Sequence, residues 1–245
     1  MRQTPQTTGA TEQAAVPPTP MLGRLNRAAN QPIFGVKRKL WRKDDDHAYV
    51  ADAGFIPVRA EVLQRDGYTC RFCGFKASKY QEVHHLDDNH QNNDPQNLLT
   101  ICNLCHQVHH LGMCAMRNSG FVAAIPELTQ TEINNIVRAI HVSTLIANAT
   151  VRDRLKSLFA IFQFRGIDTL KSLYGLDISN PYILAQTLSS CSDEIYAKRA
   201  ALFAPLRLVA TKEAFHAGQL EFYAADLRSV FNCNNWPDLT HKLFM

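Results

Sequence analysis

Two Cys-x-x-Cys pairs constrain the fold of this chain more than any other feature. Cys70 and Cys73 form the first pair, and Cys102 and Cys105 form the second after 28 intervening residues. This spacing lets two thiolates from one tight turn bind the same tetrahedral Zn²⁺, and two pairs fill its coordination shell. Gly74 suits such a turn, because glycine readily adopts a positive φ. We therefore predict a structural zinc site that leaves no position for a water molecule.

Two disulfide bonds, or four buried free thiols, are the alternatives to this zinc site. The chain has 245 residues and seven cysteines, and its N-terminal sequence lacks the apolar segment of a secretion signal. We therefore disfavour a disulfide scaffold and expect a cytoplasmic protein. No run of about 18 apolar residues is present, so we expect no direct insertion into a membrane. Cys114, Cys191 and Cys233 have no spaced companion, and we interpret them as buried or idle thiols.

Composition divides the chain into four segments. Residues 1–32 are rich in Thr, Gln and Pro, which predicts a disordered N-terminal tail. Residues 33–58 form a basic and aromatic lead-in, for which short strands are one interpretation. Residues 59–118 contain the cysteine pairs and form the predicted zinc module. Residues 126–235 carry helical patterns and form a predicted small helical C-terminal domain, so we expect an α+β protein.

The lead-in carries basic residues interleaved with aromatic ones. Seven basic residues and no acidic residue lie between Arg24 and Lys43. Such a run can follow a phosphate backbone or bind an acidic protein surface, and its alternative is an edge strand with a solvated charged side. The net charge of +4 is too small to indicate nucleic-acid binding by itself. The candidate nucleic-acid or partner-binding residues are Lys37, Arg38, Lys39, Trp41, Arg42 and Lys43.

Histidines accompany the cysteines of the predicted zinc module. Residues 82–86 alternate in polarity as a strand does, which would aim His84 and His85 at opposite faces. An Asp- and Asn-rich stretch follows and predicts a loop. His106 and His110 come directly after the second cysteine pair at a spacing of four, so on a helix they share one face. Either His84 or His106 can also be read as a zinc ligand in place of a cysteine.

Residues 69–111 resemble the HNH, or ββα-metal, endonucleases through the order Cys-x-x-Cys-Gly, Val-His-His-Leu, Asn-Leu-Leu and Cys-x-x-Cys-His-x-x-x-His. The resemblance implies a β-hairpin and a helix around one divalent cation, which would be Mg²⁺, Mn²⁺ or a second Zn²⁺. His85 would then be the general base, and Asn97 would brace its loop. Phosphodiester hydrolysis needs a base that works near neutral pH and a cation on the phosphate. The ligands of this catalytic metal would be His84, His106 and His110.

Helical patterns dominate the C-terminal half. Thr129 and Glu132 form a capping box before apolar residues at helical spacing, which predicts a helix over about 130–146. We interpret the apolar stripes as the core of a small bundle, although such a stripe can also bind a partner helix. Other helices are predicted over 60–67, from Thr150, from Asn180, from Ser192 to before Pro205, and as a pair over about 211–231.

Three segments, residues 63–75, 125–133 and 162–165, resemble in order the IcmJ/DotN component of type IVB secretion systems. The match covers about residues 55–215, and its Pro-Glu-Leu-Thr-Gln stretch lies outside the generic HNH pattern. The resemblance implies a cytoplasmic zinc protein of the coupling complex, peripheral to the inner membrane through its partners. Those partners would be a DotL-type coupling ATPase and other coupling-complex proteins, and related machines also carry DNA in conjugation.

Two functions follow from these patterns. In the first, the protein is a zinc-stabilised adaptor that docks on the coupling ATPase. In the second, it is an active metal-dependent HNH endonuclease that cleaves DNA. The IcmJ/DotN resemblance implies a scaffold that has lost the nuclease histidines, whereas this chain retains them. We favour the adaptor, because its resemblance covers more of the chain, and leave enzymatic activity open.

Overall fold

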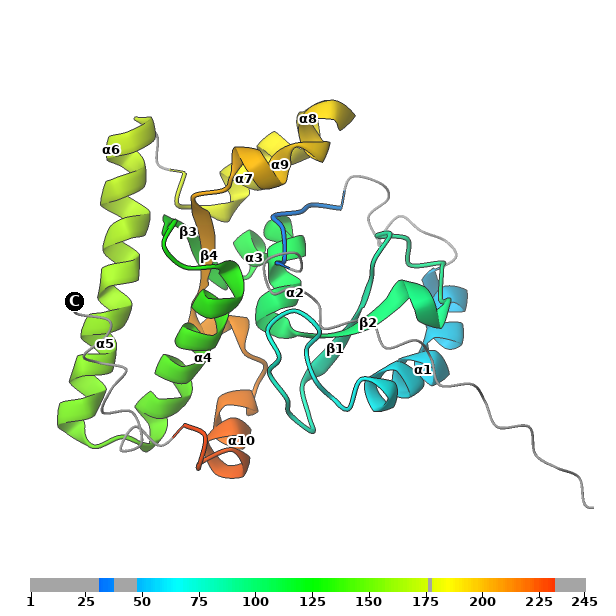
Figure 1. The fold of residues 1–245 in the computed structure, drawn as a ribbon, viewed down its shortest axis with the longest axis horizontal. Coiled ribbons are helices and arrows are strands. Elements are labelled where there is room, and N and C mark those ends of the chain that lie inside the picture. Colours follow the sequence, from blue (N-terminus) through cyan, green and yellow to red (C-terminus); the bar gives the residue numbers. More distant parts are fainter. Residues whose placement is uncertain (1–30, 38–47, 176–177, 232–245) are drawn as a thin grey trace, which may run out of the picture. The chain divides into compact units, whose positions relative to one another are not determined.

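The computed structural model describes residues 31–37, 48–175 and 178–231, and short strands alternate with helices along them (Figure 1). The predicted tail lies outside these ranges up to residue 30. Lys37 lies within them, whereas the other candidates of the basic lead-in lie outside the described residues. Those residues are Arg38, Lys39, Trp41, Arg42 and Lys43. Across the three described ranges, no helix has the length and apolar character that a membrane span requires.

The first helix begins earlier than the sequence pattern predicts. α1 spans Ala48–Arg65 and continues through Pro57, although proline removes one intrahelical hydrogen bond. Phe55 and Val58, which precede the predicted start, pack against a buried cluster formed by α1 and the neighbouring strands, and this contact stabilises the longer helix. Residues 32–37 have no regular secondary structure. The described part of the lead-in therefore contains helix and irregular chain instead of short strands.

A β-hairpin and a short helix follow the first cysteine pair. β1 (Gln81–His85) pairs antiparallel with β2 (Leu98–Cys102), with Gln81 opposite Cys102 and His85 opposite Leu98. This confirms the predicted strand. α2 (Asn103–His109) starts immediately after β2, and α3 (Leu111–Met116) continues from it. The end of β2 and the start of α2 therefore place the second cysteine pair at one point of the fold.

The C-terminal half contains a second small sheet, which corrects the expectation of an entirely helical domain. β3 (Gly120–Ala124) pairs antiparallel with β4 (Leu206–Ala210). The side chain of Gln130 donates to the carbonyl of Leu208 and accepts from its amide, both at 2.8 Å, so it occupies the free edge of β4. β3 and β4 are each five residues long and mostly apolar, and so short an apolar run fits a buried strand or the end of a helix equally well. The sequence pattern therefore did not predict these two strands.

The predicted C-terminal helices are largely confirmed. α4 spans Gln130–Ile146 and begins with the predicted capping box of Thr129 and Glu132. The predicted helix from Ser192 is broken into two short helices, and Gly218 forms the N-cap of the last helix at φ 75°. Of the predicted pair over 211–231, the first member is only a 3₁₀ turn (Lys212–Ala214), and the second is α10 (Gln219–Asp226). The other helical elements of the described residues are a 3₁₀ turn (Pro95–Asn97), α5 (Ala149–Phe164), a π-helical turn (Arg165–Thr169), α6 (Leu170–Tyr174), α7 (Pro181–Ser190), α8 (Asp193–Ala197) and α9 (Arg199–Leu202).

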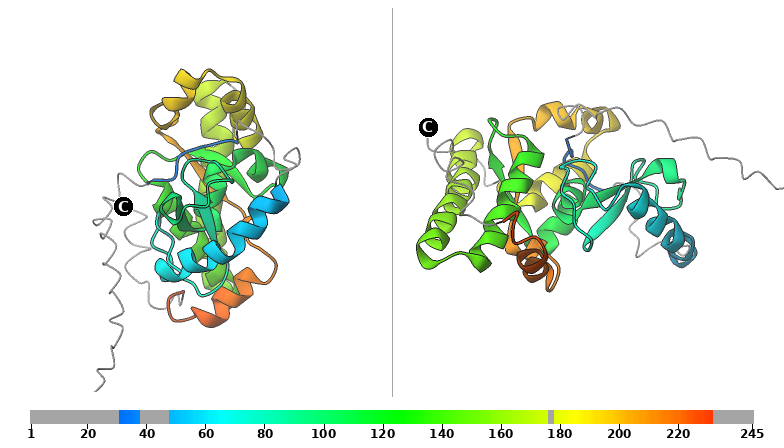
Figure 2. Two further views of the ribbon diagram at one scale, coloured as in Figure 1. Left: turned by 90° about the vertical axis from the view of Figure 1, so that its right-hand side faces the viewer. Right: turned by 60° about the horizontal axis from the view of Figure 1, so that its bottom comes forward.

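One apolar core connects the cysteine pairs to the C-terminal elements. Ile101 and Leu104, which flank the second pair, pack with Ile133 and Val137 of α4 and with Val209 of β4. Across Figure 1, from right to left, α1 is followed by the β1–β2 hairpin, then by α2, then by β3, β4 and α4, and finally by α5. Figure 2 shows the same elements, in the same colours, from two other sides. Buried side chains of the two halves belong to this one cluster. The boundary between a zinc module and a C-terminal domain stays a prediction.

Candidate metal centres

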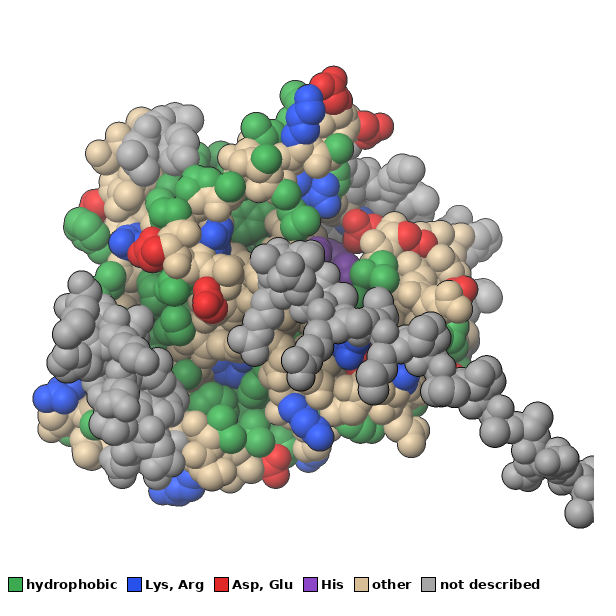
Figure 3. Space-filling view, in the orientation of Figure 1, with side chains coloured by type: hydrophobic (Ala, Val, Ile, Leu, Met, Phe, Trp, Pro, Cys, Tyr) green, Lys and Arg blue, Asp and Glu red, His purple; other side chains and the backbone are tan. Residues whose placement is uncertain are grey.

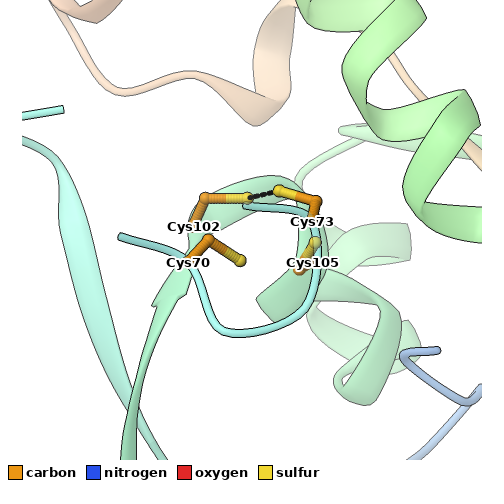
Figure 4. A group of neighbouring side chains, drawn as sticks. All are labelled: Cys70, Cys73, Cys102 and Cys105. Atoms are coloured by element: carbon orange, nitrogen blue, oxygen red, sulfur yellow. Dashed lines mark hydrogen bonds between the residues drawn. The ribbon is translucent and has the colours of Figure 1, made fainter. Parts of the chain in front are cut away.

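The four predicted cysteine ligands lie together at the start of α2, and their side chains point toward one another (Figure 4). Their sulfur atoms all lie within 4.8 Å of one another, and the Sγ atoms of Cys73 and Cys102 are 3.7 Å apart. A tetrahedral metal with bonds of roughly 2.3 Å to sulfur has sulfur–sulfur edges of roughly 3.8 Å. A disulfide bond needs about 2 Å. The predicted cluster is therefore confirmed as a group that can hold a metal ion.

Backbone hydrogen bonds shape the turn that carries the first cysteine pair. Gly74 has φ 73°, and its amide donates to the carbonyl of Cys70 at 2.9 Å. The amide of Arg71 donates to the carbonyl of Thr100 at 2.9 Å, which attaches the turn to β2. The first pair is thus fixed against the strand that ends in Cys102.

A buried arginine of α4 contacts the sulfur cluster. Arg138 is 1% exposed, and its Nη2 donates to the Sγ of Cys102 at 3.0 Å and lies 3.8 Å from the Sγ of Cys73. No ion pair joins this guanidinium to a carboxylate within the described part of the chain. Burial by itself lowers the pKa of Arg138, but the neighbouring cysteine sulfurs raise it above its ordinary value.

This buried cation favours one interpretation of the cluster. Neutral thiols cannot balance the charge of Arg138, and an unbalanced buried charge is costly. Thiolates bound to a metal ion do balance it. Asn134, one turn earlier on α4, donates its Nδ2 to the Sγ of Cys105 at 3.2 Å. The surroundings therefore suit metal-bound thiolates better than four free thiols.

Three of the predicted histidines form a second group of potential ligands. His84 of β1, His106 of α2 and His110, the C-cap of α2, each place a nitrogen within 4.8 Å of the others. The Nε2 atoms of His106 and His110 are 3.1 Å apart. Burial lowers the pKa of His84 to about 2 and that of His110 to about 3, so both rings are neutral near pH 7. Neutral imidazoles offer the lone pairs that a divalent cation binds.

Glu82 orients this histidine group. Its carboxylate accepts from the Nδ1 of His106 at 2.5 Å and from the Nε2 of His216 at 3.0 Å. With its Nδ1 hydrogen donated to Glu82, a neutral His106 presents a bare Nε2 toward His110, as histidines do when they bind a metal. Burial by itself raises the pKa of Glu82, but its hydrogen bonds to the two histidines hold it well below its usual range.

His216 is a site residue that the sequence patterns did not reveal. It follows β4 and lies 134 positions along the chain from Glu82, with no spacing that connects the two. Its hydrogen bond to Glu82 raises the pKa of His216 above the ordinary value. Only the folding of the C-terminal half against the hairpin brings this side chain to the histidine group.

The other two HNH-type residues lie near the loop between β1 and β2. Asn97 donates its Nδ2 to the Oδ1 of Asp87 at 2.8 Å and to the carbonyl of Asn92 at 3.0 Å, which closes this loop. The Nε2 of His85 lies 3.1 Å from the Oδ1 of Asn93. His85 does not belong to the group formed by the three other motif histidines. Its role as a base stays a prediction.

A pocket of about 380 Å³ opens beside the histidine group. Its walls include His106, His110 and His216, together with the cationic side chains of Arg59 and Arg117. Figure 3 shows that histidine side chains (purple) reach the surface on one face of the molecule, close to acidic side chains. His106 and His110, but not the buried His84, can therefore be reached from solvent through this pocket.

Comparison with known proteins gives the family. No family model matches the chain. The chain is 32% identical over 178 residues to the type 4 apparatus protein DotN of Legionella pneumophila, strain Philadelphia 1. The match covers 71% of this chain and 81% of that protein. The chain therefore belongs to the IcmJ/DotN family of type IVB secretion proteins, as the sequence resemblance predicted.

We expect Cys70→Ser to release the bound metal and to unfold the surrounding structure. A structural zinc contributes roughly 10 kcal/mol or more to small sites, which is comparable to the whole stability of a typical domain. Zinc content by plasma mass spectrometry and thermal unfolding by circular dichroism measure the effect. Cys191→Ser is the matched control, because Cys191 lies outside the cluster. A Cys70→Ser protein that keeps its zinc and its Tm would contradict the assignment of these ligands.

Proposed function

We propose that this protein is a zinc-stabilised adaptor in the coupling complex of a type IVB secretion or conjugation system, where it docks on a DotL-type coupling ATPase. Family membership carries this proposal, because the relative is named as a type 4 apparatus protein and the match extends well beyond the cysteine pairs. Four sulfur ligands leave a zinc ion no open position, so its role is structural. The adaptor acts in the cytoplasm and reaches the inner membrane through its partners.

Exposed apolar residues on the C-terminal helices support a docking role. Ile161, Phe164 and Ile167 follow one another at a spacing of three along α5 and the π-helical turn, and they are 44%, 63% and 56% exposed. Clustered large apolar side chains on a protein surface commonly mark interaction sites. We therefore assign this stripe to the ATPase-binding surface. The basic lead-in, including Lys37, remains a second candidate for binding a partner or a nucleic acid.

Phe164→Asp is expected to weaken binding to the cytoplasmic part of the coupling ATPase at least tenfold, because the apolar contact is replaced by a charge. Isothermal titration calorimetry measures the Kd. Ile183→Asp is the matched control, since Ile183 is 40% exposed but lies on α7. Failure of the wild-type protein to bind the ATPase would contradict the adaptor proposal, and equal loss in both variants would contradict the choice of surface.

A metal-dependent endonuclease is the second candidate, and the histidine group favours it. His84, His106 and His110 would hold Mg²⁺, Mn²⁺ or a second Zn²⁺, and their mutual approach is the observation in support. Such a cation, when bound, stabilises negative charge on a scissile phosphate. His85 would accept a proton from water, and Asn97 would hold the loop that follows it. Glu82 would keep His106 in its ligating orientation, while Arg59 and Arg117 would contact phosphate groups of the DNA.

Nicking of supercoiled plasmid tests this second candidate. With added Mg²⁺, Mn²⁺ or Zn²⁺, we expect the wild-type protein to nick DNA and His85→Ala to lose at least 100-fold in rate, since a general base contributes roughly 10²- to 10⁴-fold. His141→Ala is the control, because His141 contacts the carbonyl of Ala210 in the C-terminal half. Absence of nicking with every cation would exclude the nuclease, and undiminished nicking by His85→Ala would point to a contaminant.

A further inference from the structure

A zinc centre with four cysteine ligands carries a net negative charge. Four thiolates and one Zn²⁺ carry −4 and +2, which leaves a net charge of −2. Cys102 and Cys105 are fully buried, and Cys70 is 1% exposed, so water does not surround most of this charge. A buried net charge destabilises its site unless a counter-charge or hydrogen-bond donors compensate it.

Arg138 is placed to supply that counter-charge. We propose that Arg138 is a positioning residue of the four-cysteine centre, which raises metal affinity by balancing its negative charge and by donating a hydrogen bond to the Sγ of Cys102. The inference rests on the zinc centre of the proposed function. It assigns to α4, outside the predicted zinc module, a direct part in holding the metal.

The guanidinium of Arg138 is held in its orientation by further contacts. Its Nη1 donates to the Oδ1 of Asn135 at 2.6 Å. Its central carbon lies 3.8 Å from the centre of the Phe75 ring, an arrangement that favours a cation over the aromatic face. These contacts leave Nη2 to face the sulfurs of Cys102 and Cys73. The planar fork of arginine makes both contacts at once, which the single ammonium of lysine cannot do.

Asn134 adds a neutral donor from the same face of α4. Its spacing of four from Arg138 puts the two side chains on neighbouring turns, and its Nδ2 donates to the Sγ of Cys105 at 3.2 Å. Hydrogen bonds to both sulfurs of the second cysteine pair therefore come from one helix. Because only Arg138 carries a charge, substituting the two residues separately distinguishes the effect of charge on metal affinity from the effect of a hydrogen bond.

The test uses full-length protein and two measurements. Competition with a chromogenic chelator gives the zinc affinity, and substitution with Co²⁺ gives the energy of the thiolate-to-cobalt charge-transfer bands. Arg138→Met is expected to weaken zinc binding about 10- to 100-fold, the range seen when groups that support metal ligands are removed. It is also expected to move the bands to lower energy, because a thiolate that loses an N–H donor gives up electrons more easily.

Three further variants make the result specific. Arg138→Lys keeps the charge, so we expect a smaller loss of affinity but a clear band shift. Asn134→Leu removes a neutral donor, and its loss of affinity should be smaller than that of Arg138→Met. Arg154→Met is the control on α5, where the side chain is exposed, and should match the wild-type protein.

Unchanged bands, with zinc affinity within twofold of the wild type, would overturn the proposal. If Arg138→Met does not fold, Arg138→Lys is measured in its place. Its charge-transfer bands are expected to shift, because Nη2 contacts the sulfur of Cys102, and unshifted bands would overturn the proposal. A wild-type protein that binds neither zinc nor cobalt in the same assay would instead refute the zinc centre on which the inference rests.

Discussion

Four cysteine sulfurs within 4.8 Å of one another form the point at which the two halves of this structure meet. The first cysteine pair lies on the turn after α1, and the second lies where β2 ends and α2 begins. Arg138 of α4 then donates to the same sulfurs from the C-terminal half. A buried arginine is unfavourable without negative charge nearby, so thiolates bound to a metal ion would balance the charge of Arg138, and Arg138 would in turn stabilise them.

The cysteines and the histidines form separate groups along α2. Cys105 lies in the first turn of the helix, His106 directly follows it, and His110 is the C-cap; both histidines lie within 4.8 Å of His84 through their ring nitrogens. The four cysteines suit a structural role, because four sulfur ligands would fill the coordination shell of a metal ion. The three histidines suit a chemical role, because three imidazole ligands would leave a cation with open positions. The cysteine cluster therefore says little about nuclease activity.

Local patterns in the sequence predicted those features that neighbouring residues determine. The spacing of the cysteines gave their cluster, and the capping box at Thr129 gave the start of α4. Contacts between distant residues leave no such pattern. The pairing of β3 with β4, the hydrogen bond between Glu82 and His216, and the approach of Arg138 to the sulfurs all depend on how the C-terminal half packs against the hairpin. The catalytic roles of His85 and Asn97 stay predictions, because His85 lies beside Asn93 and outside the group of His84, His106 and His110.

X-ray absorption at the zinc edge of the purified protein identifies the atoms that bind the metal. We expect one dominant shell of four sulfur atoms at roughly 2.3 Å. In protein loaded with one zinc per chain, a nitrogen in this shell would mean that His84 or His106 replaces a cysteine as a ligand. Zinc surrounded mainly by nitrogen or oxygen, or protein without zinc, would contradict the claim that the four cysteines hold the metal on which the fold depends.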